Sequence, residues 1–118
     1  MRNISFHNRK KLDELVVQLE HDLLDLKQKF NDYFDKDLLG FINWNMEDMI
    51  QIKCTIDALK LLQLRLDVPK SEVNTTLQDF CVWHLTAVNY KDINSIGKYT
   101  ATAWKEILDE IRFFEDGE

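Results

Sequence analysis

Residues 9–34 read RKKLDELVVQLEHDLLDLKQKFNDYF and carry apolar side chains that are spaced alternately four and three residues apart. This spacing lays one apolar stripe along a single helix, because an α-helix returns to the same face about every 3.6 residues. Asp13 and Glu14 stand in the first turn, where the helix dipole favours negative charge. The pattern predicts a long amphipathic helix from about Asn8 or Arg9 to Phe34. The stripe consists of Leu12, Val16, Leu19, Leu23, Leu26, Phe30 and Tyr33.

Three further segments combine a capping residue with helical spacing of apolar side chains. These predicted helices span residues 46–66, 71–90 and 95–114, and their predicted N-caps are Asn45, Ser71, and Asn94 or Ser95. The helix at 46–66 is apolar on nearly all sides, which is typical of a helix at the centre of a core. The sequence therefore predicts an all-α, single-domain bundle of four main helices, with the second helix the most buried.

Residues 35–45 are predicted to form a short apolar connecting segment after the first helix. A surface connection is usually polar, yet Leu38–Trp44 is mostly apolar and holds two aromatic residues. One interpretation places Leu38, Phe41 and Trp44 under the end of the bundle as a short helical turn that caps the core. Another exposes them as an aromatic anchor for a partner. A mixed arrangement, with some side chains buried and Trp44 half exposed, is the third alternative.

The length of 118 residues fits one domain, residues 1–118, with a core that needs no metal or disulfide. We expect residues 1–8 and 115–118 to fray. Cys54 and Cys81 fall in apolar helical segments, where a free buried thiol is the usual state. No apolar run has the length of a signal-peptide core or of a membrane span. These features predict a cytoplasmic protein that does not enter a membrane.

The formal net charge of −6 is unevenly distributed along the chain. Residues 1–11 carry four basic side chains, whereas residues 12–48 hold ten acidic side chains against three lysines. Nucleic-acid binding requires a contiguous basic face, so the sequence predicts no nucleic-acid partner. An acidic surface of this kind suits a basic protein partner.

The residue types that carry chemistry are scattered singly, so we predict no enzyme activity, no metal site and no cofactor. His84 lies alone within an apolar stripe and is interpreted as a neutral core histidine. Glu106, Asp109 and Glu110 form one half of the acid ladder with which some helical enzymes hold magnesium. A second half is missing from the other predicted helices.

The function predicted from these features is direct binding of a basic toxin or effector, as an immunity or inhibitor protein does. Immunity proteins of bacterial contact-dependent inhibition systems and of nuclease bacteriocins are similar to this chain in size and charge. The alternative is a structural or adaptor subunit that assembles through apolar helix surface. The first hypothesis predicts a monomer in the absence of its partner. The predicted partner-contact residues are Asp22, Asp25, Asp32, Asp35, Asp37, Trp44, Glu47 and Asp48.

Overall fold

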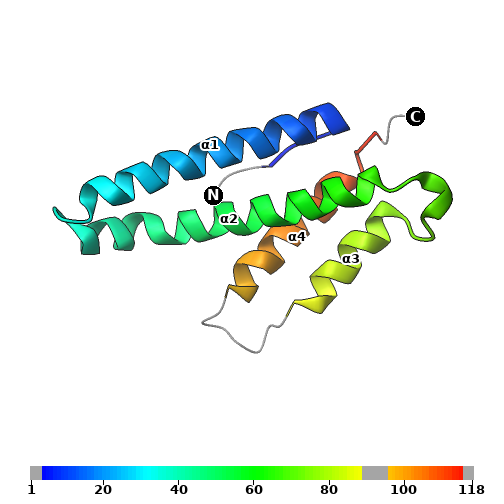
Figure 1. The fold of residues 1–118 in the computed structure, drawn as a ribbon. Coiled ribbons are helices and arrows are strands. Elements are labelled where there is room, and N and C mark those ends of the chain that lie inside the picture. The colour runs from blue at the N-terminus through cyan, green and yellow to red at the C-terminus, as the bar shows by residue number, and fades with distance from the viewer. Residues whose placement is uncertain (1–3, 89–95, 116–118) are drawn as a thin grey trace.

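The computed structural model describes residues 4–88 and 96–115, and within those ranges its regular structure is helical. In chain order the elements are α1 (Arg9–Tyr33), α2 (Leu38–Asp67), the 3-10 helix η1 (Lys70–Glu72), α3 (Leu77–Ala87) and α4 (Gly97–Ile111). The predicted all-α bundle of four main helices is confirmed (Figure 1). The predicted caps of the last helix, Asn94 and Ser95, lie outside the described residues. The described helices include none with the length and apolar character needed to span a membrane.

Helices α1 and α2 run antiparallel and form a long hairpin (Figure 1). α1 begins where the sequence predicts, because the Asn8 side chain accepts a hydrogen bond from the Lys11 backbone N–H (2.9 Å). Residues 34–37 connect it to α2. Asp37 caps α2, since its carboxylate accepts a hydrogen bond from the Gly40 backbone N–H (3.1 Å). The connection is therefore much shorter than the sequence suggests.

The prediction that residues 35–45 form an apolar connecting segment was wrong for most of that range. Leu38–Trp44 is helical, and the predicted cap Asn45 lies inside α2, where its Nδ2 donates to the Phe41 carbonyl (3.2 Å). The reason is a long-range contact. Phe41 is 4% exposed, and its ring stacks on Tyr33 of α1 with centroids 6.1 Å apart. Two extra helical turns bury apolar surface that a loop would leave in water.

The predicted cap Ser71 does not begin the third helix. It lies in η1, and the polar residues 74–76 favour a turn before the chain becomes helical again. Thr76 caps α3 instead, because its hydroxyl accepts a hydrogen bond from the Asp79 backbone N–H (3.0 Å). The third helix is therefore shorter than the 71–90 expected from the sequence.

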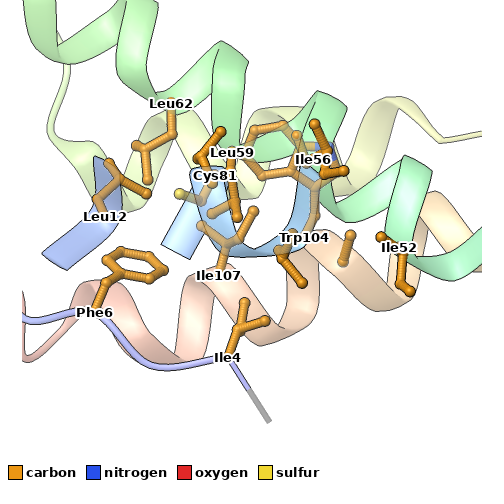
Figure 2. Close-up of a cluster of buried hydrophobic side chains, with 14 of the residues drawn as sticks. Ile4, Phe6, Leu12, Ile52, Ile56, Leu59, Leu62, Cys81, Trp104 and Ile107 are labelled. Atoms are coloured by element: carbon orange, nitrogen blue, oxygen red, sulfur yellow. The ribbon is translucent and has the colours of Figure 1, made fainter. Parts of the chain in front are cut away.

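Helix α2 lies between α1 and α4, but the prediction that it is the most buried helix is not confirmed, because five of the 15 residues of α4 are buried and only eight of the 30 residues of α2. Helix α2 packs against α1 and α4, and α3 packs against α4 (Figure 1). Figure 2 shows the core where these helices meet. Leu12 of α1, Leu59 and Leu62 of α2 and Ile107 of α4 are all 0% exposed there. Each such side chain stabilises the fold by about 1.5–3 kcal/mol relative to an exposed position.

The segment before α1 also packs in the core, in a region where the sequence analysis expects residues 1–8 to fray. Ile4 and Phe6 are buried, and the Phe6 ring meets the Phe114 ring edge-on with centroids 5.9 Å apart. The Glu115 backbone N–H donates to the His7 carbonyl (2.6 Å). The start of the described chain is thus held by the segment that follows α4, a contact between distant residues that no local pattern reveals.

Both cysteines are free and buried, as the sequence analysis expects. Burial raises the pKa of the Cys54 thiol, and it raises the pKa of Cys81 to about 11. The cause is that a thiolate loses its hydration away from water. Because thiolate is the reactive form, both cysteines act as small apolar side chains of the core.

His84 lies in a cluster of rings between α3 and α4. Its ring stacks on Trp104 with centroids 4.4 Å apart and an interplanar angle of 7°. Phe80 and Trp83 meet it edge-on at 4.6 Å and 4.9 Å. Burial lowers the pKa of His84 below its ordinary value of 6.5, since the half-buried ring is more stable uncharged. This environment agrees with the interpretation of a neutral packing histidine.

We expect His84→Leu to resist acid better than the parent protein. The unfolded chain binds the His84 proton more tightly than the folded chain, so the parent loses stability as the pH falls from 6.5 toward the lower folded pKa. Above 6.5 this contribution to stability is complete, and leucine removes the dependence. Urea unfolding from neutral to mildly acidic pH measures the effect, with His21→Leu, at an exposed position of α1, as the control. A stability difference between His84→Leu and the parent that is the same at every pH would contradict this.

Candidate partner-binding surface

The structure distributes the eight predicted contact residues over three places along the α1–α2 hairpin. Two lie on α1, three lie in the last turn of α1 and the connection, and three lie on α2. In that order they are Asp22 and Asp25; Asp32, Asp35 and Asp37; and Trp44, Glu47 and Asp48. The second and third groups are near one end of the hairpin. Asp25 precedes Asp32 by about 10 Å along the helix axis.

Asp22 and Asp25 interact with neighbours on their own helix. Gln18 Nε2 donates to Asp22 Oδ1 (2.9 Å), and His21 Nδ1 lies 3.6 Å from Asp25 Oδ2. Both pairs are four residues apart on an exposed surface, where such contacts contribute a few tenths of a kcal/mol at most. These two carboxylates support α1 locally and add negative charge beside the hairpin.

The end of the hairpin, residues 30–44, is built around four aromatic rings. We call these residues the hairpin end. Phe30 meets Phe34 and Phe41 edge-on at 5.9 Å and 5.6 Å, while Tyr33 stacks on Phe41. Aromatic pairs in these geometries are stabilising beyond the area that they bury. The cluster joins α1 to α2 at the end of the hairpin.

Large apolar side chains remain exposed around this aromatic cluster. Tyr33 and Phe34 are about half exposed, Leu39 is 78% exposed and Trp44 is 82% exposed. Leu38–Trp44 thus combines a buried Phe41 with exposed side chains, and Trp44 is more exposed than the half-exposed position in the mixed alternative. Isolated apolar residues are ordinary on a protein surface, but several at one end of a molecule are typical of an interaction site.

Negative charge accompanies these exposed side chains. Residues 30–48 contain five carboxylates and one basic residue, Lys36. Asp32, Asp35 and Asp37 are all exposed, although the Asp37 carboxylate also caps α2. The hairpin end therefore combines aromatic surface with a field that attracts positive charge.

A groove lies beside the hairpin end, between α2 and α4, and has a volume of about 750 Å³. We call it the α2–α4 groove. Predicted contact residues Trp44, Glu47 and Asp48 line it from α2. The remaining lining residues are Ile4, Leu19, Gln51, Ile52, Thr55, Lys98, Tyr99, Thr102 and Glu106. Its floor is apolar and its walls are polar, as in many sites that bind a ligand or a partner side chain.

Hydrogen bonds across the α2–α4 groove hold its walls in place. Tyr99 Oη donates to Glu47 Oε1 (3.2 Å), and Gln51 Nε2 donates to the Tyr99 carbonyl (3.0 Å). Both bonds connect α2 with the start of α4. The Lys98 ammonium lies 4.9 Å from the centre of the Tyr99 ring, a cation–π contact. The rim of the groove is therefore ordered in the free protein.

Glu106 is a half-buried carboxyl group in the wall of the α2–α4 groove. Burial raises the pKa of Glu106 above its ordinary value, and the nearby Asp109 carboxylate raises it further. Both causes disfavour its negative charge. A cation placed in the groove would stabilise the Glu106 carboxylate and offset the free-energy cost of burying its charge.

The contribution of α4 to this surface is not visible in the sequence. Glu106 is seen there only as part of an acid ladder, and nothing connects it with Glu47, because 58 residues separate the two. Tyr99 and Lys98 had no distinguishing signal in the sequence. Among the described residues, no group of three histidine, cysteine or acidic side chains is placed to hold a metal ion. Comparison of the chain with known protein families, with characterised proteins and with solved structures finds no match.

Proposed function

We propose that this protein binds a basic toxin or effector and neutralises it, with the hairpin end as the contact surface. One observation carries the proposal: exposed aromatic and apolar side chains coincide with a cluster of carboxylates at one end of a rigid hairpin. An inhibitor needs a surface of this kind and no catalytic groups of its own.

The apolar part of the hairpin end supports a tight contact. Exposed aromatic side chains are frequent anchors of protein interfaces, because they bury a large area at a small cost in conformational entropy. Trp44 and Phe34 are suitable anchors, since the aromatic cluster beneath the hairpin end already orders its backbone. The binding surface is thus formed before the partner arrives, which reduces the entropic cost of association.

The charged part of the hairpin end supports selection of a basic partner. Carboxylates around an apolar contact steer a positively charged protein toward it and disfavour acidic competitors. A basic toxin that acts on nucleic acid or on a membrane surface would present such positive charge. By covering this positive charge, the bound protein would directly block the action of the toxin.

Replacement of the carboxylates at the hairpin end should slow association with the partner by about 10-fold or more at low salt. The variant is Asp32→Lys with Asp35→Lys and Asp37→Asn, because asparagine keeps the N-cap of α2. High salt should reduce the difference from the parent, since counterions screen the attraction. Stopped-flow or biolayer measurements of the association rate at several salt concentrations test this expectation.

A matched control changes the net charge by the same amount elsewhere. Asp57→Lys on α2, Glu72→Lys on η1 and Asp79→Asn on α3 supply that change away from the hairpin end. Equal slowing by both variants would show that total charge, and not the hairpin end, governs association. Neutralisation itself is tested with the partner identified by affinity purification. Its toxicity in cells should be suppressed by the parent protein and less effectively by the hairpin variant.

A second candidate function is assembly through the outer face of α2. Leu61 and Leu64 share one exposed face of this helix, with Leu64 64% exposed, and the exposed Val68 follows as its C-cap residue. Such a face suits self-association or attachment to a larger complex. Size-exclusion chromatography with light scattering distinguishes the candidates, because the inhibitor should be a monomer when free. A stable oligomer that is dissociated by Leu64→Glu would favour assembly.

A further inference from the structure

We infer that the α2–α4 groove receives a lysine or arginine side chain from the surface of the basic partner, an inference that rests on the proposed function. The groove lies next to the hairpin end and shares Trp44 with it. A partner seated on the hairpin end would therefore place part of its surface over the groove. An inserted lysine or arginine side chain would add a second contact between the partner and this protein, beside the contact at the hairpin end.

The form of the groove suits a long side chain that ends in a positive charge. Ile52 and Leu19 supply apolar surface for the methylene groups of such a side chain. Trp44 and Tyr99 supply aromatic faces at the rim, and aromatic faces attract cations through their negative quadrupole. The volume of about 750 Å³ leaves room for the residues that flank the inserted side chain.

The charges in the groove wall favour a cation over an anion. Glu47 and Glu106 reach the groove from opposite sides, on α2 and α4, and Asp48 adds a third carboxylate to the lining. Lys98 is the single basic residue among the lining residues. Burial and the nearby Asp109 carboxylate both disfavour a negative charge on Glu106, so an ammonium or guanidinium that entered the groove would interact favourably with this carboxylate.

The position of Lys98 shows that the groove rim already accommodates one positive group. Its ammonium occupies a cation–π position on the Tyr99 ring without an ion pair to Glu47 or Glu106. An exposed lysine can move away at little cost, because its contacts at the surface are weak. Removal of its charge should therefore make the groove more attractive to an external cation.

The groove is tested without the partner, with N-acetyl-arginine amide as the probe and N-acetyl-citrulline amide as its uncharged isostere. Titration of ¹⁵N-labelled protein should produce saturable shifts of the Trp44 indole and of backbone amides around Thr102 and Glu106. The arginine probe should cause these shifts, and the citrulline probe should not, because the carboxylates recognise charge. The lysine probe N-acetyl-lysine amide should bind the same residues.

Three variants test which charged side chains determine binding of the probe. Glu106→Gln should weaken the arginine probe about 10-fold, which corresponds to the loss of one charge-assisted hydrogen bond. Glu110→Gln is the matched control, because it removes a carboxylate from the same helix outside the groove lining. Lys98→Met should strengthen binding, which a general loss of structure could not produce.

The inference is overturned if the citrulline probe shifts the same residues as strongly, if Glu110→Gln weakens binding as much as Glu106→Gln, or if no shift saturates. None of these three results contradicts the proposed function, which is tested separately by the association rate of the hairpin variant. If the groove binds no probe while the hairpin variant still slows association, the groove inference alone fails. If the probe binds but the partner associates equally fast with parent, hairpin variant and charge control, the proposed function of the hairpin end fails and the groove stands as a cation site.

Discussion

Trp104→Ala should lower the free energy of unfolding by about 3–5 kcal/mol. Trp104 is 2% exposed and lies between α4 and α3, where it meets Phe80 edge-on at 5.8 Å and stacks on His84. Its removal leaves a cavity that the surrounding helices fill only in part. Because the free energy of unfolding of a small domain is about 5–15 kcal/mol in total, this single substitution should remove a large share of it.

Urea unfolding followed by far-ultraviolet circular dichroism measures the loss, and Trp83→Ala provides a matched control. Trp83 lies on the same side of the bundle but is 64% exposed, so its removal should cost no more than about 1 kcal/mol. Comparable losses for the two variants would mean that Trp104 is not the residue that joins α3 to α4. A far smaller loss for Trp104→Ala than expected would have the same meaning.

Trp44→Ala should weaken binding of the basic partner by about 30-fold or more, since hot-spot residues contribute at least about 2 kcal/mol. Trp44 is positioned to act on both parts of the surface, because it lies at the hairpin end and lines the α2–α4 groove. Most of the effect should come from faster dissociation, as is usual for substitutions within one interface. The melting temperature should stay close to that of the parent, because the side chain is 82% exposed.

Isothermal titration calorimetry with the purified partner measures this effect, and Trp83→Ala again serves as the control. It removes an exposed tryptophan from α3, away from the hairpin end. If Trp83→Ala weakened the partner as strongly as Trp44→Ala, the contact surface would have to include α3. An unchanged affinity for Trp44→Ala would remove the aromatic anchor from the proposal.

The features that depend on neighbouring residues could be predicted from the sequence. The stripe from Leu12 to Tyr33 predicted α1, because a helical repeat involves residues within a few positions of one another. The nearly continuous apolar pattern of residues 46–66 predicted the central helix for the same reason.

Features that depend on contacts between distant residues were decided by the tertiary structure alone. Leu38–Trp44 is compatible with a loop or a helix until Phe41 meets Tyr33 of α1, and burial of the Phe41 ring then favours the longer hairpin. Phe6 is buried because the segment after α4 packs against it.

The candidate surface shows the same division. The acidic and aromatic composition of residues 30–48 is visible in the sequence, so the hairpin end could be proposed from it. The α2–α4 groove could not, because Glu47 and Glu106 come to line one groove only when α4 packs on α2. Local patterns determine which segments are helical and which of their faces are apolar. Packing determines which distant charges share a site, since that depends on the free energy of burying all the faces together.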